Sequence, residues 1–155
     1  AQARYDLLAA GANPDEIASF VEEMLRLEGS TKVTFRLALE DVTVGETLIP
    51  AGKAIVVGLA AGNRDPDKWD DPTAFRLDRP GIRKHLAFGR GRHTCIGAAL
   101  ARAEVIVLLK SLLKATSAIR IDEAEHGPPG ARRLSYEPSY IIRGLDALHV
   151  VLEPA

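Results

Sequence analysis

The sequence predicts an α+β fold in which two long helices flank a β-rich stretch and short strands follow. Three observations lead to this prediction. Apolar residues recur at helical spacing after residue 14, β-branched residues gather between residues 33 and 57, and residues 97–114 are apolar almost all round. We find no internal repeat, low-complexity tract or linker, so residues 1–155 are expected to form a single domain.

The first helix is predicted to begin around residues 13–16. Asn13 can cap it, Pro14 suits the first helical position, and Glu16 completes a capping box. Residues 29–30, a glycine and a serine, are expected to end it. The residues at helical spacing form one apolar face: Ile17, Phe20, Val21, Met24 and Leu25.

The next part of the chain is β-rich over residues 33–39 and again over residues 48–57, with a turn at residues 50–52. Residues 62–92 are irregular and are interrupted by Asp-Pro and Pro-Gly steps. An irregular segment this long inside a compact domain is usually functional or disordered.

The helix predicted over residues 97–114 is apolar on nearly every side, which is typical of a helix buried in a core. Short strands are expected around Ile119, over residues 140–142 and over residues 148–152. A loop rich in glycine and proline separates the first of these from the others.

Composition and charge exclude several classes of function. The chain is 46% hydrophobic and 26% charged, as in ordinary globular proteins, and its formal net charge is −1. Nucleic-acid and membrane-surface binders favour a strongly basic face, and no apolar run reaches the roughly 18 residues of a membrane span. We therefore expect no nucleic acid and no membrane as partners. The chain opens on Ala1 rather than Met, so it is expected to begin inside a longer protein.

Cys95 is the only cysteine of the chain. A single cysteine excludes an internal disulfide, and it excludes a multi-cysteine zinc site or iron–sulfur cluster built by this chain alone. It fits a reducing compartment, so a cytoplasmic location is expected. Cys95 is then either an inert buried thiol or a single specialised ligand.

The run from Phe88 to Gly97 favours the ligand. Gly89 and Gly91 allow backbone conformations that are closed to other residues, and they let a large flat partner approach the main chain. The N-terminus of the following helix favours an anion, so the sulfur of Cys95 is expected to be held as a thiolate. Gly97 removes a side chain beside this ligand.

The spacing of Phe88, Gly91, Cys95 and Gly97, F-x-x-G-x-x-x-C-x-G, resembles the haem-ligand signature of the cytochrome P-450 superfamily. Weaker similarities to soluble bacterial members cover essentially the whole chain. The resemblance implies the C-terminal portion of that mainly helical fold: a helix, a small β-sheet, the cysteine loop, a buried helix and a C-terminal β-hairpin. It also implies one haem b, with Cys95 as axial ligand of the iron and Phe88 shielding the thiolate side.

Glu23 and Arg26 match the E-x-x-R motif that the family carries on the helix before its β-rich segment. Residues three apart on a helix can pair, although such pairs are also common on solvated helix faces. The family adds an arginine from the irregular segment. Residues 71–79 resemble that segment, which places the third member at Arg79, and the three residues would lock the loop that presents Cys95.

Two positions resemble the family's partners of the haem propionates. Arg36 lies where the family places a propionate-binding arginine, and His93 lies where many soluble bacterial members have a histidine. Arginine makes short, bidentate contacts with carboxylates. The alternatives are a surface charge at a strand edge for Arg36 and a metal pair with Cys95 for His93, although two ligands make a poor zinc site.

The resemblance implies a monooxygenase that activates dioxygen to hydroxylate a small organic substrate. The electron donor would be a ferredoxin-type protein or a flavoprotein. Arg90, Arg92 and Arg102 could form a basic patch for it, although charges near a loop are often simply solvated. The family's distal helix, with its A-G-x-x-T motif, has no counterpart, so the N-terminal part of the family fold is expected to lie before Ala1.

Three functions are compatible with these features. The chain is a fragment of a complete monooxygenase, a truncated haem-binding protein without that activity, or a folded remnant in which Cys95 is inert. Apolar faces that normally pack against the missing part would be exposed, so we expect dimerisation, domain swapping or a haem shared between chains.

Overall fold

The computed structural model describes residues 14–155, so the predicted cap Asn13 lies outside the described residues. The first described helix, α2, spans Pro14–Glu28 and has Pro14 in its first position, as the sequence predicts. The backbone N–H of Gly29 closes the last turn on the carbonyl of Leu25 at 2.9 Å. A Cβ at Gly29 would lie 2.7 Å from that carbonyl oxygen, so the chain leaves the helix at a residue without a side chain.

The β-rich segment forms two separate antiparallel pairs. Strand β1 (Val33–Leu37) pairs with β4 (Ala54–Gly58), and the shorter β2 (Val42–Val44) and β3 (Thr47–Ile49) form a hairpin between them. Strand β2 falls outside both stretches that the sequence marks as β-rich. The predicted turn at residues 50–52 is present, and Gly52 has the positive φ of 80° that favours glycine.

The irregular segment is held by short elements and buried side chains rather than by regular structure. It follows the single-turn helix α3 (Leu59–Gly62) and contains two 3₁₀ turns, η1 (Ile82–Lys84) and η2 (Gly91–His93). Trp69 is only 4% exposed, and its indole N–H donates to the carbonyl of Gly62 at 3.1 Å. The segment is therefore ordered against the helices although it has little secondary structure.

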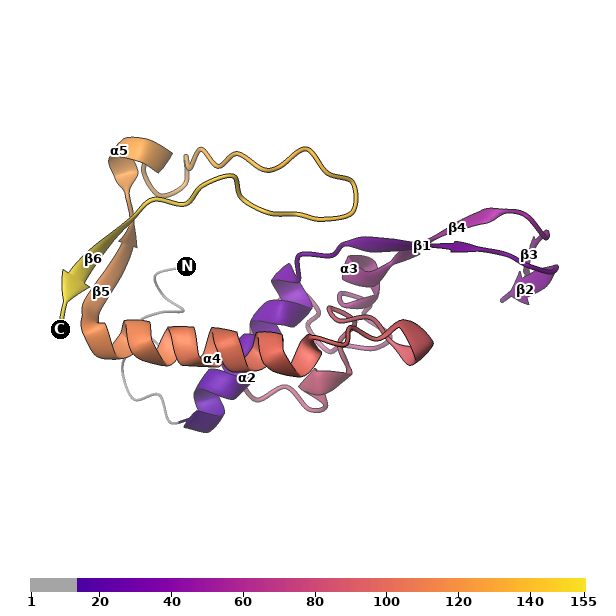
Figure 1. Ribbon diagram of the computed structural model, residues 1–155, viewed down its shortest axis with the longest axis horizontal. Coiled ribbons are helices and arrows are strands. Elements are labelled where there is room, and N and C mark those ends of the chain that lie inside the picture. The colour runs from indigo at the N-terminus through magenta and orange to yellow at the C-terminus, as the bar shows by residue number, and fades with distance from the viewer. Residues whose placement is uncertain (1–13) are drawn as a thin grey trace.

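The second long helix, α4 (Ala98–Ala115), crosses α2, and the core lies where they meet (Figure 1). Ile17 and Phe20 of α2 are its buried centre, and the ring of Phe75 packs on that of Phe20 with centroids 5.2 Å apart. Partly buried apolar residues complete this cluster: Met24, Leu77, Ile106, Leu109 and Leu113.

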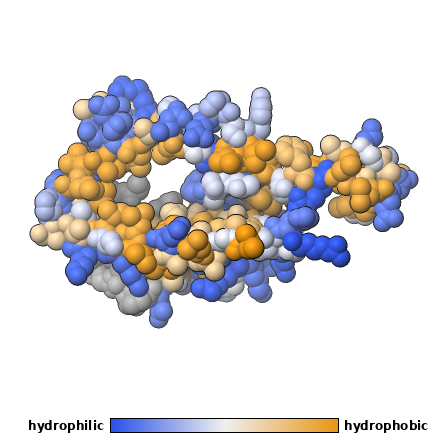
Figure 2. Space-filling model, viewed as in Figure 1, coloured by the Kyte–Doolittle hydropathy of each residue, from blue (hydrophilic) through white to orange (hydrophobic). Residues whose placement is uncertain are grey.

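The prediction that α4 is buried in a core is wrong within the described residues. No residue of α4 is buried, and Leu100, Val107 and Leu108 are 63%, 62% and 57% exposed. The reason is that α2 covers one stripe of the helix only. Figure 2 shows apolar residues gathered along the helices and at both ends of the molecule.

The C-terminal region is built on an antiparallel pair of strands, β5 (Thr116–Ile121) and β6 (Val150–Pro154). Between them, the single-turn helix α5 (Glu123–His126), which the sequence does not predict, is capped by Asp122, whose carboxylate accepts the N–H of Ala124 at 2.8 Å. Residues 140–142, predicted as a strand, contribute only one isolated bridge, from Ile142 to Thr31. Among the described helices, none combines the length and apolarity that crossing a membrane requires.

Candidate functional site

Cys95 lies three residues before α4, at the end of the loop that leads into this helix. Its backbone N–H donates to the carbonyl of Phe88 at 2.9 Å. Within the loop, the backbone N–H and hydroxyl of Thr94 donate to the carbonyl of Gly91 at 3.1 and 2.9 Å. Cys95 itself is exposed and not part of a disulfide. The alternative of an inert buried thiol is therefore contradicted.

Two glycines of this loop have backbone conformations that other residues rarely adopt. The φ angles of Gly89 and Gly91 are 69° and 79°, in the left-handed region. Gly97 is different, because its φ of −83° is open to any residue. A Cβ at Gly97 would instead lie 3.8 Å from the sulfur of Cys95, in ordinary van der Waals contact with it.

Glu23, Arg26 and Arg79 form one buried ionic cluster. The carboxylate of Glu23 accepts from Arg26 Nε and Nη2, both at 2.8 Å, and from Arg79 Nε at 3.0 Å. The three residues are 0%, 1% and 5% exposed. The alternative of a solvated helix face is therefore contradicted for this pair on α2.

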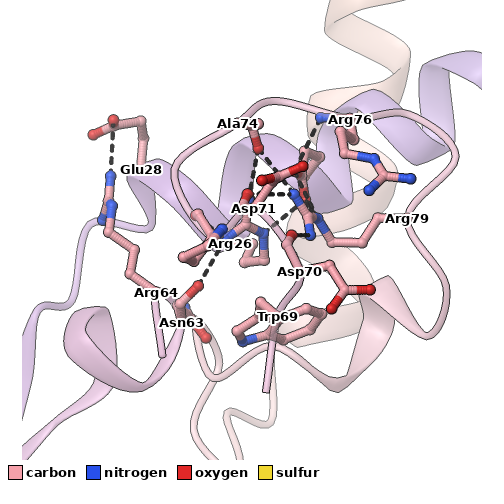
Figure 3. Close-up of polar contacts among 12 residues, drawn as sticks. Arg26, Glu28, Asn63, Arg64, Trp69, Asp70, Asp71, Ala74, Arg76 and Arg79 are labelled. Carbon is pink, nitrogen blue, oxygen red and sulfur yellow. Dashed lines mark hydrogen bonds and ion pairs between the residues drawn. The ribbon is translucent and has the colours of Figure 1, made fainter. Parts of the chain in front are cut away.

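The same cluster binds the irregular segment to α2. Figure 3 shows the guanidinium groups of Arg26 and Arg79 converging on the carbonyl of Ala74, at 3.1 and 3.0 Å. The backbone N–H of Arg76 donates to Glu23 at 3.1 Å. Burial by itself raises the pKa of the Glu23 carboxyl, but the hydrogen bonds from these three arginines outweigh it and lower that pKa. Further carbonyls bound by the two guanidinium groups belong to Asn63, Asp70, Asp71 and Pro72.

A second ionic cluster centres on Glu22, which the sequence analysis missed together with His85. Glu22 is 3% exposed, and its carboxylate accepts from Arg102 Nε at 2.6 Å and contacts His85 Nε2 at 2.9 Å. Burial raises the pKa of Glu22, but the hydrogen bonds from His85 and Arg102 lower it to about 2. The one sequence feature that could have indicated this cluster is the position of Glu22, directly beside the apolar face of α2.

The sequence suggested that Arg102 belongs to a basic patch for an electron donor. The structure shows instead that its charge is already paired within the chain. Its guanidinium is bound to Glu22 and lies over the ring of Phe88, with the central carbon 4.6 Å from the ring centroid. Arg90 and Arg92, by contrast, are exposed in the loop before Cys95.

Arg36 and His93, the expected propionate partners, are both exposed. Arg36 lies on β1, where its Nη1 donates to the hydroxyl of Thr34 at 2.8 Å and to the carbonyl of Phe35 at 2.7 Å. His93 ends η2, two residues before Cys95. Residues 14–155 contain no group of three or more His, Cys, Asp and Glu side chains that could hold a metal ion, which leaves a zinc pair of His93 and Cys95 without further ligands.

Comparison with known proteins assigns the chain to a family. The family model of cytochrome P-450 matches residues 17–124, a range that includes most of α2, both ionic clusters, the cysteine loop and α4. The chain belongs to the cytochrome P-450 family. The resemblance recognised in the sequence is confirmed, and the family implies a haem cofactor.

Two similar curated proteins come from bacteria. The chain is 41% identical over 143 residues to cytochrome P-450 140 of Mycobacterium tuberculosis and 39% identical over 163 residues to the cytochrome P-450 monooxygenase PikC of Streptomyces venezuelae. These alignments cover 92% and 97% of this chain but 31% and 36% of the relatives. The chain therefore spans about a third of the length of the curated relatives that it matches.

Solved structures of cytochromes P-450 superimpose on this chain. A cytochrome P-450 of Mycobacterium marinum in the substrate-free form superimposes with a TM-score of 0.91 at 45% identity, over 97% of this chain and 36% of that one. A second match is P-450 BioI in complex with an acyl carrier protein carrying hexadec-9Z-enoic acid, with a TM-score of 0.82 at 34% identity, over 94% of this chain and 35% of that one. The predicted fold class, the C-terminal portion of the cytochrome P-450 fold, is confirmed.

Proposed function

We propose that this chain forms the thiolate side of a haem-thiolate monooxygenase, with Cys95 as the axial ligand of the iron in haem b. The observation that carries the proposal is that the single cysteine of the chain is exposed on an ordered loop. Cys95 is exposed three residues before α4, on a loop in which Gly89 and Gly91 have left-handed backbone conformations. A thiolate is a soft ligand that suits haem iron.

The surroundings of Cys95 suit a large, flat and mainly apolar group. Ile96 beside it is fully exposed, and Leu100 in the first turn of α4 is 63% exposed, so apolar side chains are available to pack against a macrocycle. Within residues 14–155, Arg36 has no carboxylate partner, so its guanidinium is available for a propionate.

These residues divide the work of holding the haem. Cys95 would bind the iron, Arg36 and His93 would bind the propionates, and Phe88 would cover the sulfur side. Gly89 and Gly97 would keep the backbone close to the macrocycle. When bound, the haem supplies the activation of dioxygen that hydroxylates a small organic substrate, while the thiolate raises electron density at the iron.

The proposal also covers the electron donor and the location of the protein. The electron donor would be a ferredoxin-type protein or a flavoprotein, and the exposed Arg90 and Arg92 offer positive charge near the cysteine loop for an acidic donor. The proposal keeps the cytoplasmic location that the single cysteine favours, and it involves neither nucleic acid nor a membrane as partner. Several apolar residues of α4 are exposed, because no other part of the described chain packs on them. This exposed apolar surface supports the association of two copies.

The test is the absorption spectrum of the reduced protein under carbon monoxide, after haem has been supplied. A thiolate-type, red-shifted Soret band that is lost in Cys95→Ser is expected. Haem-free protein under all conditions, or an unchanged band in Cys95→Ser, would overturn the proposal. Turnover of small organic substrates with a reconstituted donor then separates a monooxygenase from a protein that only binds haem.

A further inference from the structure

The carboxylate of Glu22 binds two residues that lie on opposite sides of the cysteine loop in the sequence. His85 precedes the loop and contacts Glu22 Oε2 at 2.9 Å, while Arg102 follows it and donates to both carboxylate oxygens, at 2.6 and 3.0 Å. Both ends of the loop are therefore attached to the same point of α2. The side chain of Glu22 is 5% exposed, so water competes little for these bonds.

Phe88 lies between these two residues and continues the connection to Cys95. The guanidinium carbon of Arg102 is 4.6 Å from the centroid of the Phe88 ring, and the ring of His85 is 6.2 Å from it. The carbonyl of Phe88 accepts the backbone N–H of Cys95 at 2.9 Å. Arg102 also reaches the first turn of α4, where its Nη1 donates to the backbone carbonyl of Ala98 at 3.3 Å.

The hydrogen bonds of His85 indicate that Arg102 is the main positive charge beside Glu22. The backbone N–H of Ala87 donates to His85 Nδ1 at 3.1 Å, so this nitrogen is an acceptor. The proton of a neutral ring then lies on Nε2, which donates it to Glu22. Arg102 supplies the positive charge, because Arg83, at 3.7 Å from Glu22, is 75% exposed and screened by water.

We propose that Arg102 is a positioning residue for Cys95, because Glu22 holds its guanidinium against Phe88 and Phe88 fixes the backbone of Cys95. The relevance of this arrangement to an iron ligand rests on the proposed function. The arrangement itself concerns contacts within the polypeptide, so it can be tested without haem.

The first test is hydrogen exchange of the Cys95 amide in haem-free protein. Arg102→Gln removes the charge and the stacked guanidinium, and loss of one charged hydrogen bond is expected to make exchange about tenfold faster. Arg83→Gln is the matched control, because Arg83 faces the same carboxylate without touching Phe88. Equal exchange of the Cys95 amide in the two variants would overturn the proposal.

Arg102→Lys covers the case in which Arg102→Gln fails to fold. Lysine keeps a positive charge for Glu22 but lacks the planar group that lies on Phe88. Faster exchange of the Cys95 amide, at an unchanged thermal midpoint, is expected. Exchange as slow as in the unaltered protein would show that charge alone holds the loop and would reject the role of Phe88.

The second test uses haem-loaded protein. Arg102→Gln and Arg102→Lys are expected to lose part of the thiolate-type Soret band of the reduced carbon monoxide complex and to shift the reduction potential, whereas Arg83→Gln keeps both. Unchanged band and potential in the Arg102 variants would argue against positioning of the ligand. If the unaltered protein shows no thiolate-type band, the proposed function fails, and the exchange experiment still decides the role of Arg102.

Discussion

Glu22 and Glu23 are neighbours on α2, yet their carboxylates bind two different segments of the chain. Glu22 binds the residues on either side of the cysteine loop, and Glu23 binds Arg79 and the backbone of the irregular segment. Both side chains are almost fully buried, at 5% and 0% exposure. One turn of α2 therefore positions both the irregular segment and the loop that presents Cys95.

Removing the charge of Glu23 is expected to destabilise the fold strongly. In Glu23→Gln, the guanidinium groups of Arg26 and Arg79 remain buried without a compensating charge, which costs about 3–5 kcal/mol for such a pair. Urea denaturation monitored by circular dichroism measures the free energy of unfolding.

The matched control for this variant is Glu28→Gln on the same helix. Glu28 pairs with Arg64 at 3.3 Å, but the two side chains are 55% and 35% exposed. An exposed pair of this kind contributes about 0.2–1 kcal/mol. Similar losses of stability in the two variants would show that the Glu23 cluster has no special structural role.

Stability is expected to fall in acid because of Glu22. Its pKa is about 2 in the folded chain against an ordinary 4.5, so the unfolded chain binds more protons between these values. The contribution of Glu22 is complete above pH 4.5 and is lost as the pH falls toward about 2. The free energy of unfolding, measured across this range, should decrease more steeply for the unaltered protein than for Glu22→Gln. Parallel curves would contradict this assignment.

Gly91→Ala is expected to destabilise the cysteine loop through the backbone alone. Its φ is 79°, and a Cβ there would meet no atom within 4 Å. An L-residue in this left-handed conformation costs roughly 1–2 kcal/mol. Gly144→Ala is the control, because its surroundings are equally open and its φ is not in that region. Thermal unfolding of both variants should show a loss for Gly91→Ala only.

Arg36→Ala is expected to weaken haem binding without altering the fold. Arg36 is exposed and its hydrogen bonds are local to β1, so the haem-free variant should unfold at the same denaturant concentration. Loss of a charged hydrogen bond to a propionate should lower haem affinity about tenfold. The control is Lys53→Gln, because Lys53 is an exposed cation directly before β4 in the same strand pair. Titrating both variants with haem separates loss of a propionate contact from a general loss of positive charge. Equal haem affinities of the Arg36→Ala and Lys53→Gln variants would reject Arg36 as a propionate partner.

The exposed face of α4 is expected to make the isolated chain associate. Val107 and Leu108 are 62% and 57% exposed, so apolar surface remains in contact with water. Leu108→Glu should shift the chain toward monomer in light scattering, whereas Lys110→Glu, an exposed polar position on the same helix, should not. A monomer at all concentrations before substitution would contradict the expectation.

The local pattern of the sequence was sufficient to predict the two long helices. Helical spacing and Pro14 predicted α2, and the apolar run predicted α4, because these signals depend on residues that are near in the chain. The burial of α4 could not be predicted in this way. It depends on how much surface other segments provide, and α2 covers only one stripe of it.

The sequence by itself determined the family and the identity of Cys95 as the candidate ligand, because a short motif with fixed spacing carries both. The tertiary structure alone decided the role of Glu22, whose partners His85 and Arg102 are distant in the chain and meet only after α2, α4 and the loop have packed. It also decided that Arg102 is bound rather than free. Which side chains meet depends on distances in space, and residues far apart in the chain leave no local pattern that would show that they meet.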